Sequence, residues 1–351
     1  MQIGIIGLKF AGKTTLFNAI TGTGLPTGQG GVDPHRAVGK VPDPRLDRLT
    51  EMFRPRRTVQ AQVEWVDVPG FETGTAAGGV REATRFLEHA RRVDALAVVM
   101  RDFDGGYGAP DPAGDLETLL LELTVADLEI VERRCERLAS DRKKLGKVAN
   151  PQEPDLMERF RTQLEAGRPL RELELSGDEQ KLISGFSFLT SKPLVAVVNH
   201  AEGETPDPDA LMHARDAGAE VVALCLAVEA ELAQLDAAEA QEFLAELGIE
   251  EPAVARMIRA AYAALQLQSF FTVGPDECRA WTVKRGTLAP RAGGVIHSDL
   301  ERGFIRAEVV RYDDLVNAGS MAAARDAGRV RLEGKNYEIQ DGDIVEIRFS
   351  V

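Results

Sequence analysis

Residues 7–14 carry the spacing G-x-x-x-x-G-K-T, and these are the residues of the chain with the clearest chemistry. An apolar segment, residues 2–6, precedes them, and a helix-forming segment follows, as this phosphate-binding pattern requires. Glycines allow close approach of the backbone to a phosphate, and successive N–H groups hold its charge. We expect Lys13 to reach the β- and γ-phosphates and the Thr14 hydroxyl to ligate Mg²⁺. The predicted phosphate-binding residues are Leu8, Lys9, Phe10, Ala11, Gly12, Lys13, Thr14 and Thr15.

A second pattern, D-x-x-G, follows the apolar segment 63–66 as Asp67-Val68-Pro69-Gly70. P-loop GTPases keep an acidic residue near Mg²⁺ here and a glycine that senses the γ-phosphate. We therefore assign Asp67 as a second metal ligand and Gly70 as a catalytic backbone position. Phe71 stands where Ras-like GTPases have the glutamine that orients water. An aromatic ring cannot orient water, so hydrolysis must use another group.

A third pattern, N-x-x-E, ends the apolar segment 193–198 as Asn199-His200-Ala201-Glu202. GTPases carry N-K-x-D at this place, where the aspartate accepts hydrogen bonds from guanine. The longer side chain of Glu202 shifts the carboxylate, which argues against guanine recognition, whereas Asn199 can still bond a base edge. Cys225 and Leu226 follow the next apolar segment, where backbone amides usually flank the base.

These three patterns need a sheet that brings them together. Continuous apolar segments alternate with helical ones, which favours a parallel sheet covered on both faces. Ligands of such sheets bind at the carboxyl ends of the strands, where all three patterns fall. The predicted strands are 2–6, 63–67, 95–100, 194–198 and 221–224.

Two further segments interrupt or follow this α/β pattern. Leu121, Leu128, Val131, Cys135, Leu138 and Leu145 lie at spacings typical of a coiled-coil helix, and Leu156, Phe160 and Leu164 indicate a return helix. We predict an antiparallel helical hairpin. Residues 133–147 hold seven basic and two acidic side chains, which fits either a solvated face or a phosphate-binding tip. Short strands at 270–273, 279–283, 304–310, 329–332 and 344–349, with a helix over 313–327, predict a small mixed sheet.

The composition restricts the function classes. The 351 residues carry a net charge of −14, which argues against a protein that coats nucleic acid, and DNA is not an expected partner. No apolar run reaches the roughly 18 residues of a membrane span, and the N-terminus lacks a basic signal region. Three scattered cysteines favour a reducing compartment. We expect a cytoplasmic monomer that does not bind membranes.

Several motifs resemble those of the YchF family of Obg-related P-loop NTPases. They are Val41-Pro42-Asp43-Pro44-Arg45-Leu46, Ser187-Phe188-Leu189-Thr190-Ser191-Lys192-Pro193, Ala227-Val228-Glu229-Ala230 and, most specifically, Gly303-Phe304-Ile305-Arg306-Ala307-Glu308-Val309 and Gly334-Lys335-Asn336-Tyr337-Glu338-Ile339-Gln340-Asp341-Gly342-Asp343. The resemblance implies an NTPase domain (1–114 and 186–268), a coiled-coil insertion (115–185) and a C-terminal TGS-type β-grasp domain (269–351). It also implies a preference for ATP over GTP, slow hydrolysis with Mg²⁺, and contact with the ribosome, its RNA or its proteins through the insertion and the TGS domain.

The chain departs from the family pattern at four places. Phe10-Ala11 replaces Asn-Val in the glycine-rich loop, and Gly31-Val32-Asp33-Pro34-His35 replaces a switch segment that begins with threonine. The glycine-rich stretch 74–79 is shortened, and no histidine occurs between Phe103 and Leu116. Three hypotheses stay open: an ATP-hydrolysing ribosome-associated factor, a GTP-preferring switch, and a nucleotide-bound interaction module without useful turnover. A small-molecule kinase fits less well, because a TGS-like tail has no role in one.

Overall fold

The fold was analysed in a computed structural model that describes residues 1–28, 33–70, 77–106, 108–145 and 148–350. The chain forms two compact units, each built from two separate stretches of sequence. Unit 1 holds Met1–Ala37 with Glu64–Ala261, and unit 2 holds Val38–Val63 with Tyr262–Val351. Among the described residues, no helix combines the length and apolarity that crossing a bilayer demands.

Unit 1 is organised around a six-stranded sheet in the order β2-β4-β1-β5-β6-β7. From β4 through β1, β5 and β6 to β7, neighbouring strands pair in parallel. The strands are β1 (Gln2–Ile6), β2 (His35–Val41), β4 (Ala61–Asp67), β5 (Ala95–Asp102), β6 (Leu194–His200) and β7 (Glu220–Leu224). The five predicted strands and their parallel arrangement are therefore confirmed. β2 was not predicted, because its alternating polar residues carry no continuous apolar signal.

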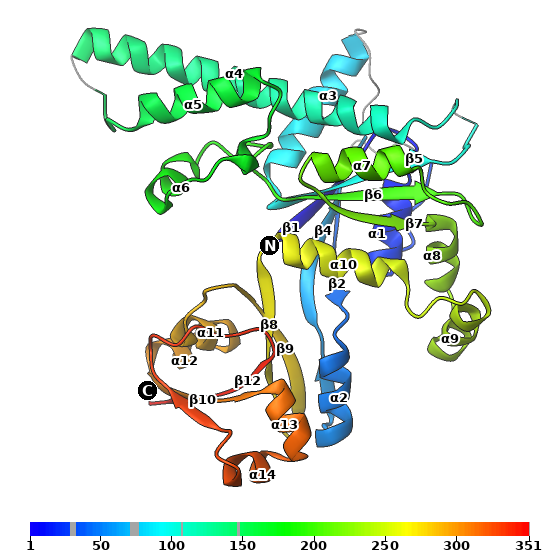
Figure 1. Cartoon of the computed structure of the whole chain (residues 1–351), viewed down its shortest axis with the longest axis vertical. Helices are drawn as coiled ribbons and strands as arrows, with labels where there is room; N and C mark the ends of the chain where they lie inside the picture. Colours follow the sequence, from blue (N-terminus) through cyan, green and yellow to red (C-terminus); the bar gives the residue numbers. More distant parts are fainter. Residues whose placement is uncertain (29–32, 71–76, 107, 146–147, 351) are drawn as a thin grey trace. The chain divides into compact units, whose positions relative to one another are not determined.

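Helices cover both faces of this sheet (Figure 1). On one face, α3 (Ala77–Arg91), α4 (Pro112–Leu145) and α7 (Pro208–Asp216) contribute Phe86, Leu119 and Ala214 to a core shared with the strands. On the other face lie α1 (Lys13–Thr21), α8 (Leu226–Leu232) and α10 (Ala253–Ala264). α9 (Ala237–Glu246) follows α8 at the margin of the unit. Burial on both faces explains why the strands are continuously apolar.

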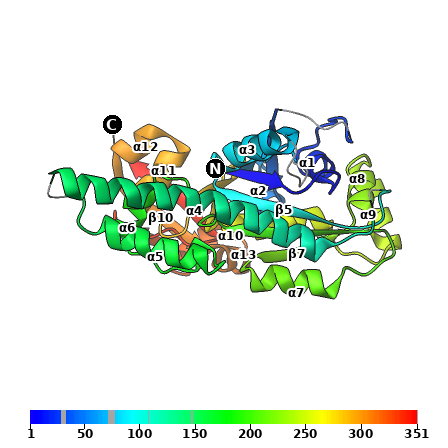
Figure 2. The ribbon, with the colours of Figure 1, turned by 90° about the horizontal axis from the view of Figure 1, so that it is seen from above.

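The predicted helical hairpin is present in unit 1. α4 runs antiparallel beside α5 (Glu153–Glu165), and two views agree on their pairing (Figure 1, Figure 2). Val131, Leu156 and Phe160 form the centre of its apolar core, in which the Phe160 and Phe188 rings meet edge to face at 5.6 Å. Buried Glu153 accepts hydrogen bonds from Arg134 at 2.7 and 2.8 Å. The short helices η1 (Leu170–Glu172) and α6 (Gly177–Ile183) complete the return to β6.

α4 differs from the prediction at its first half. Leu116, Leu119 and Leu123 pack into the sheet's core, so the helix passes without a break from this core into the hairpin, across the predicted insertion boundary at residue 115. Leu121, predicted at the coiled-coil seam, is 63% exposed. The reason is geometric: the residues two positions either side of Leu121 face the sheet, which turns Leu121 toward solvent. The side chain of Leu145, the last predicted seam position, lies outside the described residues.

Unit 2 holds the predicted mixed sheet, in the order β11-β10-β12-β8-β9-β3. β8 pairs antiparallel with β9 and parallel with β12, around a core that includes Phe270, Val309 and Val345. The predicted helix over 313–327 is two helices, because Gly319 ends the first in a left-handed conformation and Ser320 caps the second. The elements are β8 (Leu267–Thr272), β9 (Glu277–Lys284), α11 (Ala289–Ile296), α12 (Ser298–Arg302), β10 (Phe304–Arg311), α13 (Tyr312–Ala318), α14 (Met321–Asp326), β11 (Arg331–Glu333) and β12 (Asp343–Phe349).

Residues 38–63 also belong to unit 2, although the sequence analysis grouped them with the nucleotide-binding domain. They hold α2 (Pro44–Phe53) and β3 (Arg57–Val59), and β3 pairs parallel with β9. Arg45 fastens this segment: it bonds Asp341 at 2.8 Å and lies 5.3 Å above the Phe271 ring. Asp43 caps α2 and also accepts a hydrogen bond from Arg45. The Asp43-Pro44-Arg45 motif therefore has a structural role within unit 2.

Candidate functional site

One cavity of about 870 Å³ lies at the carboxyl ends of β1, β4, β6 and β7 in unit 1. Its volume is in the range typical of sites for nucleotide-sized ligands. The cavity brings together residues of all three predicted motifs. Those that line it are Lys9, Phe10, Gly12, Lys13, Thr14, Thr15, Asp67, Gly70, Asn199, Glu202, Cys225 and Leu226. Leu8 and Ala11 complete the same loop; Leu8 packs against the sheet core and Ala11 is buried.

Lys13 is the buried cation of the site. Its side chain begins α1, is 8% exposed, and donates from Nζ to the Leu8 carbonyl at 2.6 Å. Burial lowers the pKa of Lys13 to about 8, although nearby Asp67 opposes this shift. Among the described residues no carboxylate lies at hydrogen-bond distance from Lys13, and such a cation facing a cavity is suited to receive an anionic ligand.

Thr14 and Asp67, the two predicted metal ligands, line the cavity side by side. The Thr14 hydroxyl donates to Asp67 Oδ2 at 2.8 Å. Burial raises the pKa of Asp67, although Thr14, Lys13 and His35 favour the carboxylate. Hard oxygen donors of this kind fit Mg²⁺, which commonly takes one or two protein ligands and completes its shell with phosphates and water. Among the described residues no group of three or more His, Cys, Asp or Glu side chains forms a self-sufficient metal site.

Two glycines keep the phosphate end of the cavity open. Gly12 has φ +103°, and a Cβ there would lie 2.7 Å from Asn199 Nδ2. A Cβ on Gly70 would lie 2.4 Å from Lys13 Nζ and 3.0 Å from the Gly7 carbonyl. The left-handed backbone at Gly12 favours glycine, and a side chain at Gly70 would displace the Lys13 ammonium from its present position.

Asn199 joins the phosphate loop to the segment after β7. Its Nδ2 donates to the Ala11 carbonyl at 3.1 Å, and its Oδ1 accepts from the Leu226 N–H at 3.1 Å. The side chain is 5% exposed. Sequence analysis assigned Asn199 a possible bond to the base edge. In the structure its amide bonds the phosphate loop and the start of α8 and so positions both, while the bond to the base edge stays a prediction.

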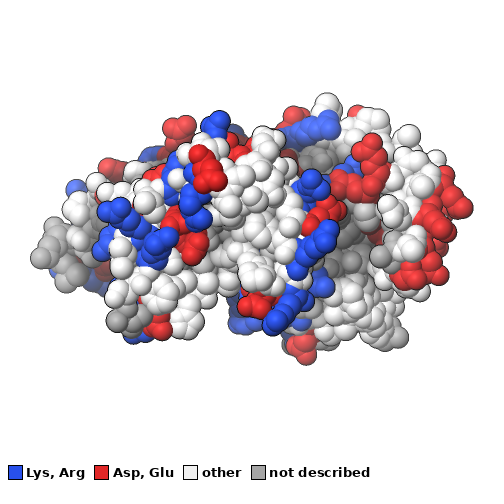
Figure 3. Space-filling view, turned by 90° about the horizontal axis from the view of Figure 1, so that it is seen from below, with Lys and Arg blue, Asp and Glu red and all other residues white. Residues whose placement is uncertain are grey.

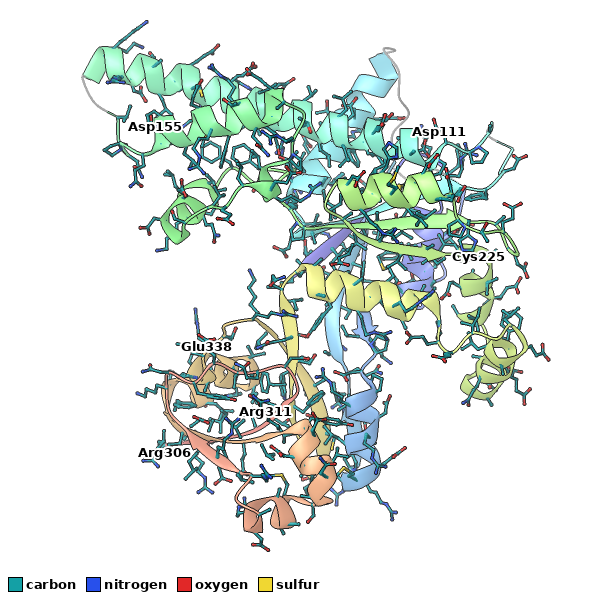
Figure 4. All side chains as sticks on the ribbon, in the orientation of Figure 1. Asp111, Asp155, Cys225, Arg306, Arg311 and Glu338 are labelled. Carbon is teal, nitrogen blue, oxygen red and sulfur yellow. The ribbon has the colours of Figure 1, made fainter. Side chains whose placement is uncertain are left out.

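The other end of the cavity holds Glu202, His200 and Cys225. Glu202 is exposed, and His200 Nδ1 lies 2.9 Å from the Ala201 carbonyl. Cys225 is a half-buried free thiol between β7 and α8 (Figure 4). This end is thus lined by an exposed carboxylate, an imidazole and a thiol, a set of groups that is compatible with a purine base.

Residues outside the three motifs also line the cavity, among them His35, Glu82, Arg85 and Asp104. His35 begins the unpredicted strand β2, and Glu82 and Arg85 are one turn apart on α3. For Glu82 and Arg85, the available signal in the sequence was the spacing of charged residues on the helix that follows D-x-x-G. Phe71, the replaced switch residues Gly31 and Val32, and residues 74–76 of the shortened stretch lie outside the described residues.

Comparison with known proteins gives consistent matches over the whole chain. Residues 2–134 match the family model of 50S ribosome-binding GTPases (MMR_HSR1). Residues 267–350 match the model YchF-GTPase_C, whose own description is a protein of unknown function.

Full-length relatives match as well. The "Ribosome-binding ATPase YchF" of Bacillus subtilis is 42% identical over 366 aligned residues, covering all of both chains. The "Obg-like ATPase 1" of Oryza sativa subsp. japonica is 36% identical, covering all of this chain and 92% of the relative. The solved structure of the Schizosaccharomyces pombe YchF GTPase is 32% identical, with a TM-score of 0.86, covering 99% of this chain and 97% of that one.

Proposed function

The chain belongs to the YchF family, as its motifs predicted, and on this premise we propose that it is an ATP-binding, slowly hydrolysing P-loop NTPase that acts with the ribosome. The observation that carries the proposal is the convergence of Lys13, the Thr14–Asp67 pair and the Asn199-held loop on one cavity. These groups provide a cation for phosphates, oxygen ligands for Mg²⁺ and a rigid frame for both.

Each polar group at the phosphate end has an internal partner that a nucleotide would replace. Lys13 would exchange the Leu8 carbonyl for phosphate oxygens, and Thr14, whose hydroxyl proton is donated to Asp67, would offer an oxygen lone pair to the metal. When bound, Mg²⁺ neutralises charge on the β- and γ-phosphates. Lys13, Gly12 and Gly70 then hold the phosphates where backbone N–H groups converge.

ATP is the favoured nucleotide because Glu202 replaces the aspartate that reads guanine in GTPases. The curated relatives are called ATPases, whereas the solved relative is called a GTPase. A GTP-preferring switch is therefore the second candidate.

The ribosome is proposed as the partner because the curated relatives are named ribosome-binding. The hairpin offers a surface of suitable charge: Arg137, Arg142, Lys143 and Lys144 on α4 are exposed, and none forms an ion pair with another described residue. We call these four residues the hairpin cluster. By contrast, acidic side chains gather over α9 at the right edge of Figure 3, a face that would repel RNA. Work on ribosomes implies a cytoplasmic protein.

Phosphate release tests the enzymatic half of this proposal. Wild-type protein and Lys13→Ala are incubated with Mg·ATP, with and without ribosomes. We expect slow release by the wild type, faster release with ribosomes, and background release by Lys13→Ala. ATP binding without any turnover above the Lys13→Ala background would instead favour a nucleotide-dependent interaction module, for which the replaced glutamine position, Phe71, is the main argument.

A further inference from the structure

A second lysine of the phosphate loop, Lys9, lies at the same cavity as Lys13. Its side chain is 27% exposed, so its ammonium lies at the cavity wall within reach of solvent. The general phosphate-binding pattern needs only backbone groups at this position. Lys9 is thus a side-chain cation added to a site that already has one.

Lys9 is held by Glu82 of α3. Its Nζ lies 3.1 Å from Oε2 and 3.2 Å from Oε1 of that carboxylate. Glu82 is 43% exposed and lines the cavity as well. An ion pair this accessible to water stabilises the protein by no more than about 1 kcal/mol, so a stronger anion in the cavity can take Lys9 from it.

The two lysines are close enough to affect each other. Lys9 contributes to the lowered pKa of Lys13, after burial of Lys13 itself. Two ammonium groups that share one cavity favour a ligand with more than one negative charge. The terminal phosphate of a nucleoside triphosphate meets this requirement, and a diphosphate offers less charge.

We propose that Lys9 is a second phosphate-binding cation: it breaks its ion pair with Glu82 and binds the terminal phosphate of a nucleoside triphosphate. This inference depends on the proposed nucleotide function of the cavity and adds a discrimination between ATP and ADP. Because Glu82 belongs to α3, the exchange also releases a tie between the phosphate loop and the helix that follows Asp67-Val68-Pro69-Gly70. Triphosphate binding would therefore loosen α3, and diphosphate binding would not.

Affinity measurements with two probes test the proposal: the non-hydrolysable analogue adenylyl imidodiphosphate and ADP, each with Mg²⁺. Lys9→Met keeps the aliphatic stem and removes the charge. We expect it to weaken the analogue about tenfold and to change ADP less than twofold. Glu82→Gln removes the carboxylate that pairs with Lys9, and we expect it to tighten the analogue about threefold without affecting ADP.

Three controls separate the possible failures. Lys9→Arg keeps the positive charge and should keep the wild-type ratio of the two affinities, whereas an unchanged ratio in Lys9→Met overturns the proposal. Hydrogen exchange in α3 should rise with the analogue in the wild type but not in Lys9→Met. If the wild type binds neither probe, or if Lys13→Ala does not weaken both, the proposed function itself fails and not only the role of Lys9.

Discussion

Lys13 illustrates at the residue scale how a binding site costs stability. Burial lowers its pKa from 10.5 to about 8. The folded protein therefore holds this proton less tightly than the unfolded chain does, and the full penalty applies below pH 8. We predict that Lys13→Met stabilises the ligand-free protein by about 1–3 kcal/mol at pH 7, after the loss of the bond to Leu8 is subtracted.

The stability difference between Lys13→Met and the wild type should depend on pH. Between pH 8 and 10.5 the unfolded chain binds more protons at Lys13, so the wild type gains stability as the pH rises and the advantage of Lys13→Met disappears. Urea denaturation at pH 7 and pH 10 measures the difference. A variant that is less stable than the wild type at pH 7 would show that the lysine is not strained by burial.

A separate prediction concerns Thr14 and the Mg²⁺ dependence of ATP binding. If Thr14 and Asp67, which bond each other at the cavity, hold Mg²⁺ as proposed, chelation of Mg²⁺ should weaken ATP binding to the wild type by at least about tenfold. In Thr14→Ala most of this Mg²⁺ dependence should be lost. Thr21→Ala is the matched control, because Thr21 lies at the far end of α1 and bonds the Phe17 carbonyl. Equal Mg²⁺ dependence in all three proteins would contradict the assignment.

At the residue scale, sequence reasoning reached the site through spacing. G-x-x-x-x-G-K-T, D-x-x-G and N-x-x-E each end or follow a strand, and parallel topology brings such ends to one edge. It could not assign the clamp role of Asn199, because that role depends on the Leu226 amide, twenty-seven positions away, which no pattern of side chains reports. His35 was missed because a lone histidine beside a proline has no spacing to interpret.

At the scale of elements, one buried carboxylate ties the middle of α4 to neighbouring segments of unit 1, in addition to the apolar packing of its first half. Asp127, fully buried, accepts hydrogen bonds from the backbone N–H groups of Leu189 and Thr190 and pairs with Arg91 at 2.9 Å. It thereby fixes the hairpin's base to the segment that enters β6. Because Leu189 and Thr190 are buried, their N–H groups would lose their partner if the carboxylate were removed.

We predict that Asp127→Ala destabilises unit 1 by about 3–5 kcal/mol, because it leaves buried donors and a cation unpaired. Asp127→Asn should cost less, since one carbonyl oxygen remains. Asp178→Ala on α6 is the control, because that side chain is 85% exposed. Hydrogen exchange at Leu189 and Thr190 reports the effect locally, and unchanged protection of both amides in Asp127→Ala would refute it.

The elements were predictable where one local rule governs them. Apolar strands in a covered sheet and the Leu156, Phe160 and Leu164 spacing of α5 are such cases. α4 was only partly predictable, since its first half packs on a sheet and its second half on a helix, and a single seam cannot describe both. The place of residues 38–63 depends on the long-range pairing of β3 with β9, for which three residues of strand carry too little signal.

For the whole molecule, charge distribution matters more than the net charge of −14. The hairpin cluster provides a local positive surface, whereas Glu239, Glu242 and Glu246 make α9 acidic (Figure 3). Contact with ribosomal RNA would therefore be confined to particular surfaces and would weaken as salt rises.

We predict that Lys143→Glu with Lys144→Glu reduces co-sedimentation with ribosomes at least about tenfold and flattens its salt dependence, while ATP affinity stays within twofold. The matched control is Lys181→Glu with Arg215→Glu, which reverses two exposed charges outside the hairpin cluster. Equal loss of ribosome binding in both double variants would mean that overall charge, and not the hairpin, determines binding.

The central claim is that the cavity binds Mg·ATP through Lys13 in preference to Mg·GTP. Isothermal titration of both nucleotides into the full chain and into Lys13→Ala tests it most directly. We expect tighter binding of ATP than of GTP by the wild type, and loss of both in the folded Lys13→Ala protein. Binding that is indifferent to Lys13, or a clear preference for GTP, would contradict the account.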